Sequence, residues 1–90
     1  MYNVAKVNDL IEKWKELKCP ERVYIRCIHS KTSNVDKQYG CKELLPNRTW
    51  RDTGISVSDM ECKDSGVLIL TTSQGTHIID IDTIFNVEFE

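Results

Sequence analysis

The chain has 90 residues, of which 40% are hydrophobic and 29% charged, and its formal net charge at pH 7 is −2. This length supports one domain with a modest core, and no apolar run approaches the roughly 18 residues of a membrane-spanning helix. Proteins that bind nucleic acid non-specifically are usually strongly basic, so the slight acidic excess argues against that class.

An amphipathic helix is predicted from Val4 to about Lys18. Its apolar residues recur at helical spacing, and they are Val4, Val7, Leu10, Ile11, Trp14 and Leu17. Asn3 is placed to cap the first turn, and Pro20 ends the helix because the residue before a proline avoids the α region. We expect Trp14 to anchor the helix against a sheet, and a stripe facing a partner is the alternative.

The N-terminal residues and the cysteines predict a cytoplasmic protein. Lys6, Asn8 and Asp9 stand where a secretory signal peptide needs an uninterrupted apolar stretch. The four cysteines are widely and unevenly spaced, at positions 19, 27, 41 and 62. Since the cytoplasm keeps thiols reduced, we expect all four to be free.

Residues 22–30 alternate in the manner of a β-strand. One face carries Val23, Ile25 and Cys27, and the other carries Tyr24, Arg26 and Ile28. We expect this strand to be the first of a small barrel.

A long loop is predicted for residues 31–53, and connections of this length tend to be functional or disordered. Basic and aromatic side chains interleave in it: Lys37, Tyr39, Lys42, Arg48, Trp50 and Arg51. Such a mixture suits a grip on a protein partner or stacking on the bases of single-stranded nucleic acid. The alternative is that the aromatic rings pack the loop onto the barrel while the charges are solvated.

Three β-rich runs follow between residues 55 and 82, separated by polar turns at residues 63–66 and 73–76. In the first run, the apolar residues change phase between Val57 and Met60, which predicts a β-bulge or a sharp bend. If Gln74 and Gly75 are the central residues of the second turn, Leu70 lies opposite Ile79, and Leu68 lies opposite Ile81.

The middle run, residues 67–72, is apolar on both faces. An antiparallel strand with one face in water should alternate apolar and polar residues, so either the helix or another subunit is expected to cover the second face. The residues exposed on that face are a candidate oligomer interface, and they are Val67, Ile69 and Ile78.

The segment from Ile79 to Phe89 resembles the end of small Sm-like and Src-homology-3-like barrels. There, a strand runs into one helical turn around an Ile-Asp-x-Ile segment and then into a short last strand. The resemblance covers residues 23–89 and implies a strongly bent barrel whose long first loop commonly lines a ligand groove. The final loop carries Asp82-Thr83-Ile84 instead of the Arg-Gly signature of Sm-like families, so their RNA binding does not carry over.

The charges are distributed asymmetrically along the chain. Residues 1–52 hold 11 Lys or Arg against 7 Asp or Glu, giving +4, whereas residues 53–90 hold 1 against 7, giving −6. The resulting field can steer a charged partner to one side of the molecule.

No residue pattern points to a metal centre. The chain lacks Cys-x-x-Cys and His-x-x-x-His pairs, from which tetrahedral zinc sites normally draw their ligands. Convergence in space is the remaining route to such a site, and the set considered is Cys19, Cys27, His29 and Cys41. We expect no metal and no cofactor.

Catalytic signatures are also missing from the sequence. His77 and Asp80 fall on opposite faces of their predicted strand, and nucleophilic catalysis needs a nucleophile beside a base. Asp80 and Asp82 share a face, where charges that keep a sheet edge soluble are common. We therefore expect a protein that is not an enzyme.

Together, these patterns predict an α+β or mainly β fold, with one domain over residues 1–90. The helix is followed by a five-stranded, strongly bent antiparallel barrel over residues 22–89. We expect an adaptor, regulator or inhibitor of a larger complex that contacts a protein partner through residues 37–51. The alternatives are single-stranded nucleic-acid binding by the same residues and small-ligand capture in a homo-oligomer interface; no membrane partner is expected.

Overall fold

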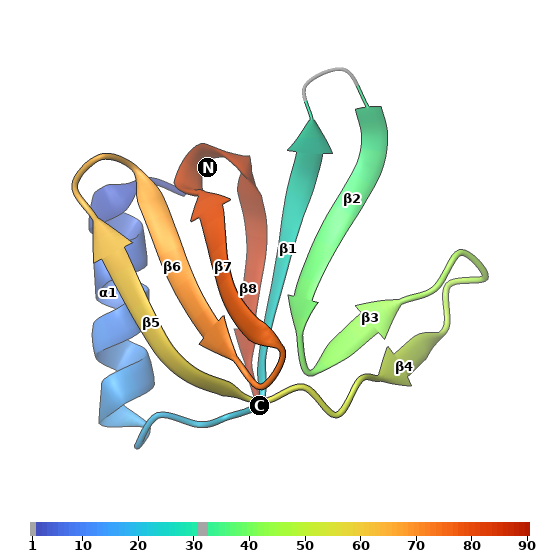
Figure 1. Ribbon diagram of the computed structural model, residues 1–90, viewed down its shortest axis with the longest axis horizontal. Coiled ribbons are helices and arrows are strands. Elements are labelled where there is room, and N and C mark those ends of the chain that lie inside the picture. Colours follow the sequence, from blue (N-terminus) through green and yellow to red (C-terminus); the bar gives the residue numbers. More distant parts are fainter. Residues whose placement is uncertain (1, 31–32) are drawn as a thin grey trace.

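The computed structural model describes residues 2–30 and 33–90, and the side chains of residues 29, 30 and 33–36 lie outside this description. The described residues form one helix and eight strands (Figure 1). The elements are α1 Val4–Glu16, β1 Val23–Ser30, β2 Ser33–Gly40, β3 Lys42–Leu44, β4 Trp50–Asp52, β5 Val57–Lys63, β6 Val67–Thr72, β7 Gly75–Asp80, the 3-10 turn η1 Ile81–Thr83, and β8 Ile84–Phe89. The predicted α+β, mainly β class is confirmed.

The strands form three antiparallel sheets in the orders β2-β1-β8, β3-β4 and β5-β6-β7. The prediction of a closed five-stranded barrel is wrong, because these sheets are open. Within the described residues, no hydrogen-bonded ladder joins an outer strand of the β2-β1-β8 sheet to an outer strand of the β5-β6-β7 sheet. Helix α1 packs against β5. The prediction of a long loop at residues 31–53 is also wrong over most of that range, because the segment contains β2, β3 and β4.

Helix α1 begins as predicted and ends earlier. The side chain of Asn3 accepts a hydrogen bond from the backbone N–H of Lys6 at 2.8 Å, which satisfies one of the orphan donors of the first turn. The helix stops at Glu16, two residues short of the predicted end, because Lys18 and Cys19 both adopt positive φ. Leu17 consequently leaves the buried stripe and is exposed.

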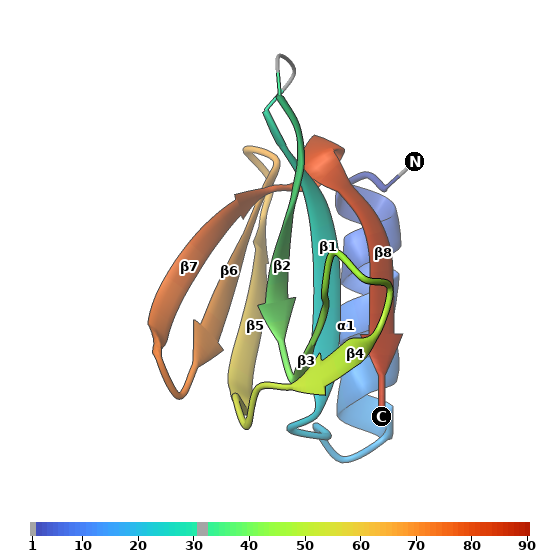
Figure 2. The ribbon, with the colours of Figure 1, turned by 90° about the vertical axis from the view of Figure 1, so that its right-hand side faces the viewer.

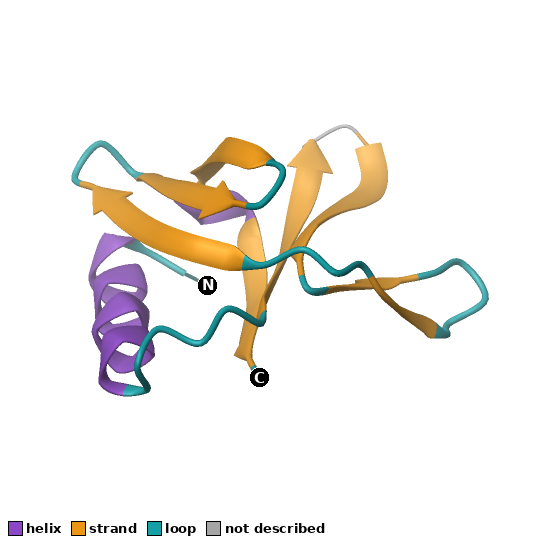
Figure 3. Cartoon of the chain, turned by 60° about the horizontal axis from the view of Figure 1, so that its bottom comes forward, coloured by secondary structure: helices purple, strands orange, loops and turns teal. Residues whose placement is uncertain are grey.

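The hydrophobic core lies between α1 and the two larger sheets (Figure 3). α1 contributes Val7, Ile11 and Trp14, and the indole N–H of Trp14 donates to the Pro20 carbonyl at 2.8 Å. Trp14 therefore anchors the helix in the core, as predicted. Each large apolar side chain buried in this way contributes about 1.5–3 kcal/mol to stability.

Strands β5, β6 and β7 form the predicted meander. The register of β5 on β6 shifts between Val57 and Asp59, which confirms the bulge. The predicted pairing of β6 with β7 is wrong by two residues. In the structure Thr72 lies opposite Gly75, and the turn between the strands is Ser73-Gln74. An even shift leaves every side chain on its predicted face.

The outer face of this meander is not covered by the helix. Leu68 and Leu70 point into the core that α1 shares, whereas Ile78 on the opposite face is 71% exposed. Val67 and Ile69 on that face are half-buried. The helix is therefore excluded as the cover, and the oligomer interface at these three residues stays a prediction.

The end of the chain follows the predicted course. β7 runs into the single turn η1, and β8 then returns to pair with β1, with Val23 opposite Phe89. This pairing places the acidic end of the chain beside β3 and β4.

Gly40→Ala is expected to be severely destabilising. Gly40 has a φ of +105°, and an added Cβ would clash with the backbone carbonyl of Val23 on β1. We expect a loss of about 3 kcal/mol or more of unfolding free energy, measured by urea denaturation.

Gly66→Ala is the matched control. Gly66 has a φ of +98°, but an added Cβ would meet nothing within 4 Å. Its expected cost is about 1–2 kcal/mol, from backbone conformation alone. Equal losses in the two variants would contradict the close approach of β2 to β1 at Gly40.

Candidate functional site

The six predicted binding residues separate into two groups at Gly40. Tyr39 lies opposite Ile25, and Lys37 opposite Cys27, so both share the face of β1 that carries core residues. After Gly40 the chain turns into the β3–β4 hairpin, which extends away from the other strands (Figure 1). That hairpin carries the other four: Lys42, Arg48, Trp50 and Arg51.

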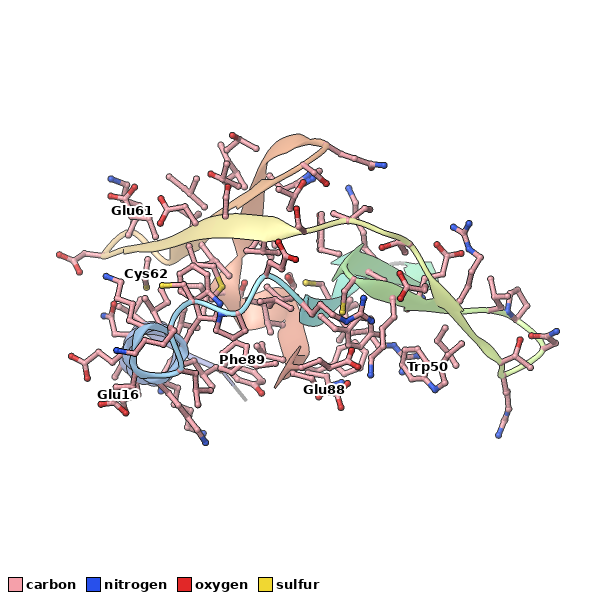
Figure 4. All side chains as sticks on the ribbon, turned by 90° about the horizontal axis from the view of Figure 1, so that it is seen from below. Glu16, Trp50, Glu61, Cys62, Glu88 and Phe89 are labelled. Carbon is pink, nitrogen blue, oxygen red and sulfur yellow. The ribbon has the colours of Figure 1, made fainter. Side chains whose placement is uncertain are left out.

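An aromatic and charged cluster forms where the hairpin meets β1 and β8. The Trp50 ring packs edge-on against Tyr24, with 5.3 Å between ring centroids. The Lys42 ammonium lies 4.6 Å from the Trp50 centroid and 5.4 Å from that of Tyr24. It is also 3.5 Å from the carboxylate of Glu88, which lies on the same side of the molecule as Trp50 (Figure 4). We call Tyr24, Lys42, Trp50 and Glu88 the Trp50 cluster.

A hydrogen-bonded side chain fixes the hairpin under this cluster. The Tyr24 hydroxyl donates to Gln38 Oε1 at 2.9 Å, and the same oxygen accepts from the Leu44 N–H at 2.7 Å. Gln38 Nε2 donates back to the Leu44 carbonyl at 3.1 Å. Since Leu44 lies opposite Trp50 in the hairpin, Gln38 ties the strand beside Trp50 to β2.

Trp50 is exposed although it is held in place. Half of its surface (51%) is accessible, whereas Tyr24 beneath it is fully buried. A side chain that is ordered before binding loses little conformational entropy when a partner covers it. The ring therefore presents a rigid apolar surface.

Most cations around the cluster already have carboxylate partners. Lys42 also lies 3.6 Å from Glu90, Arg51 lies 2.8 Å from Glu43, and Arg22 lies 3.0 Å from Asp52. The pKa of Asp52 is lowered by the N–H of Gly54, and then by Arg22. Among the described side chains, no carboxylate lies within ion-pair distance of Arg48 or Lys37.

Glu90 and Cys41 form a second contact beneath the hairpin. The Cys41 thiol lies 3.2 Å from Glu90 Oε2, to which it donates. Burial, followed by this carboxylate, raises the pKa of Cys41 to about 11. The thiol hydrogen bond in turn lowers the pKa of Glu90. Cys41 is therefore a protonated structural donor rather than a nucleophile.

The inner group, Lys37 and Tyr39, faces β7. The ring of Tyr39 lies 5.0 Å from that of His77, and the Lys37 ammonium lies 5.5 Å from the Tyr39 centroid. Hollows of about 220 and 180 Å³ lie along this contact, and Lys37 and Tyr39 line both. We call this the β2–β7 groove.

Sequence reasoning missed four residues of these two sites. They are Tyr24, Gln38, His77 and Glu88. For Tyr24 a signal was available, because a large aromatic residue on the non-core face of a strand needs a cover. Gln38, His77 and Glu88 carry no such signal, since their roles depend on strands that are distant in the sequence.

The described residues contain no group of three or more His, Cys, Asp or Glu placed to hold a metal ion. The zinc set considered above includes His29, whose side chain lies outside the description. Nor is any helix in the described ranges long and apolar enough to cross a membrane.

A scan against models of known protein families, a search of curated proteins and a search of solved structures found no match to this chain.

The cysteines are expected to differ in reactivity towards iodoacetamide. Cys19 is exposed, whereas burial raises the pKa of Cys27 and of Cys41 to about 11. At pH 8 mass spectrometry should find Cys19 alkylated first and Cys27 and Cys41 last, because the thiolate is the reactive form. Rapid alkylation of Cys41 in the folded protein would contradict its contact with Glu90.

Proposed function

We propose that this chain is a small non-enzymatic binding module that contacts a protein partner through the Trp50 cluster and the β3–β4 hairpin. The observation that carries the proposal is the rigid, half-exposed ring of Trp50. Tryptophan and arginine dominate binding energy at protein interfaces, especially where neighbouring groups exclude water. Tyr24 and Lys42, which lie against the ring, supply such neighbours.

The charges around Trp50 support a protein partner. Beside the ring, the Lys42 ammonium lies 3.5 Å from Glu88 and 3.6 Å from Glu90, so charges of both signs border Trp50. A mixed polar rim around an apolar centre is typical of protein interfaces. The roles that fit such a surface in a chain of 90 residues are adaptor, regulator and inhibitor of a larger complex.

Single-stranded nucleic acid is a weaker candidate for the same surface. Binding would require cations that are available to phosphates, and Lys42, Arg22 and Arg51 are each paired with a carboxylate. Glu88 and Glu90 add negative charge beside Trp50, where a phosphate backbone would have to pass.

Small-ligand capture has less support as well. The hollows of the β2–β7 groove hold about 220 and 180 Å³, below the roughly 300 Å³ at which ligand pockets begin. A hollow of about 480 Å³ lies elsewhere, beside Tyr2, Ser65 and Asp82, and none of the predicted binding residues lines it.

Photo-crosslinking tests the protein-partner proposal. A benzophenone amino acid placed at Trp50 should give one discrete protein adduct in cells that express the chain. The same group at Leu17, which is 52% exposed at the end of α1, is the matched control. With the recovered partner, Trp50→Ala should weaken binding by about 2 kcal/mol or more, roughly 30-fold. Equal adducts from both positions would sink the proposal.

A titration with single-stranded oligonucleotides separates the alternative. In a Trp14→Phe background the fluorescence reports on Trp50 alone, and we expect it to stay flat when DNA or RNA is added at low salt. A saturable change whose affinity falls steeply with rising salt would favour nucleic acid instead.

A further inference from the structure

Strand β7 has one free edge. It pairs with β6 on one side, and no described strand pairs with it on the other. In Figure 2, β7 is the strand of its sheet farthest from α1, and no described element continues the sheet beyond it. Its unpaired backbone groups form a template on which another strand can add.

The register identifies which backbone groups are unpaired. The Ile81 N–H donates to the Gly66 carbonyl at 3.0 Å, so the hydrogen-bonded pairs with β6 include Ile79 and His77. The N–H and C=O groups of Thr76, Ile78 and Asp80 therefore point away from β6. The Asp80 carbonyl already accepts the Thr83 hydroxyl at 2.6 Å and is also the first acceptor of the 3-10 turn η1, so at this residue the N–H is the group left for an added strand.

The edge of β7 lacks the features that keep other edges of the molecule unpaired. β5 carries a bulge and three charged residues, Asp59, Glu61 and Lys63, and the register of β8 on β1 is also shifted. β7 pairs in unbroken register, and it contains neither proline nor lysine. Ile78, at its centre, is the most exposed large hydrophobic residue among those that the structure describes.

The surroundings of this edge specify an occupant. A strand added to β7 would place alternate side chains over the hollow of about 180 Å³, where Cys27, Ile28, Tyr39 and Ile79 offer apolar surface and Lys37, Asp80 and Thr83 form a polar rim. Its other side chains would lie beside Ile78 and Asp80 on the outer face. On this outer face the strand register places three carboxylates (Asp59, Glu61 and Asp80) against Lys63 alone, which is −2.

We propose that β7 accepts an extended protein segment as an additional strand, and that this segment alternates apolar and basic residues. The apolar side chains fill the β2–β7 groove, and the basic ones lie on the acidic outer face near Asp80. Backbone hydrogen bonds to Thr76, Ile78 and Asp80 hold the segment in register. This surface is separate from the Trp50 cluster.

The probes are peptides of β7's length in which Val, Ile or Leu alternates with Lys or Arg. By NMR, we expect binding to protect the amides of Thr76, Ile78 and Asp80 from exchange, with little change at His77 and Ile79, which are already bonded to β6. Replacing the basic residues by Glu should weaken binding at least about tenfold. N-methylation of the alternate peptide nitrogens that face β7 should abolish binding.

Ile78→Pro removes one outward N–H without removing a bond to β6, and proline is tolerated at such edge positions. It should abolish peptide binding, while the control Ile78→Val retains it. Trp50→Ala should bind the peptides like the unaltered chain, so failure here is distinguishable from failure of the proposed function.

Two outcomes would overturn the proposal. One is that no basic–apolar peptide binds. The other is that the same three amides become protected as the concentration of the chain alone is raised, which would mean that a second copy occupies the edge. The N-methylated peptides keep the test decisive if Ile78→Pro fails to fold.

Discussion

The first part of strand β1, residues 23–25, is buried on both faces, and the rest of the molecule is arranged to meet that requirement. Val23 and Ile25 point into the main core, and Tyr24 points the other way, yet all three have no exposed surface. The meander and α1 cover the first face. The second is covered by the β3–β4 hairpin, whose Trp50 and Lys42 lie against Tyr24. Because the hairpin must reach across β1, its Trp50 lies at the surface in a fixed orientation.

The two larger sheets face each other without closing into a barrel. α1 packs against β5 and fills the space near β8 with apolar side chains, so that side is closed by a helix. On the other side only side chains such as Tyr39 and His77 meet. A barrel would use its edges for its own ladder, whereas here the edge of β7 stays available.

Local patterns predicted much of this fold. The helix with its Asn3 cap, the two faces of β1, the bulge after Val57 and the turn before β8 depend on neighbouring residues, and they appear where the sequence placed them. The strands inside residues 33–52 escaped prediction because they are polar and carry no apolar alternation. Their pairing depends on Gly40, whose close approach to Val23 brings β2 against β1.

The candidate site was predictable only in composition. The interleaved basic and aromatic residues do belong to the two sites. Because the chain turns at Gly40, however, Tyr39 and Trp50 lie on different surfaces. The pairing of Lys42 with Glu88 and the packing of Trp50 on Tyr24 join segments far apart in the chain. Such contacts cannot be predicted from a local sequence pattern. Ion pairs of this kind neutralise most cations of the hairpin.

The pairing of β1 with β8 has a consequence for the order of folding. The strands β5, β6 and β7 are joined by short turns, so their ladders close small loops and can form early. β1 gains its second neighbour only when Ile84–Phe89 arrives, and closing so long a loop carries a large entropic cost. During synthesis β1 leaves the ribosome well before β8 and waits with one edge unpaired. The nascent chain is most prone to misassembly in that interval.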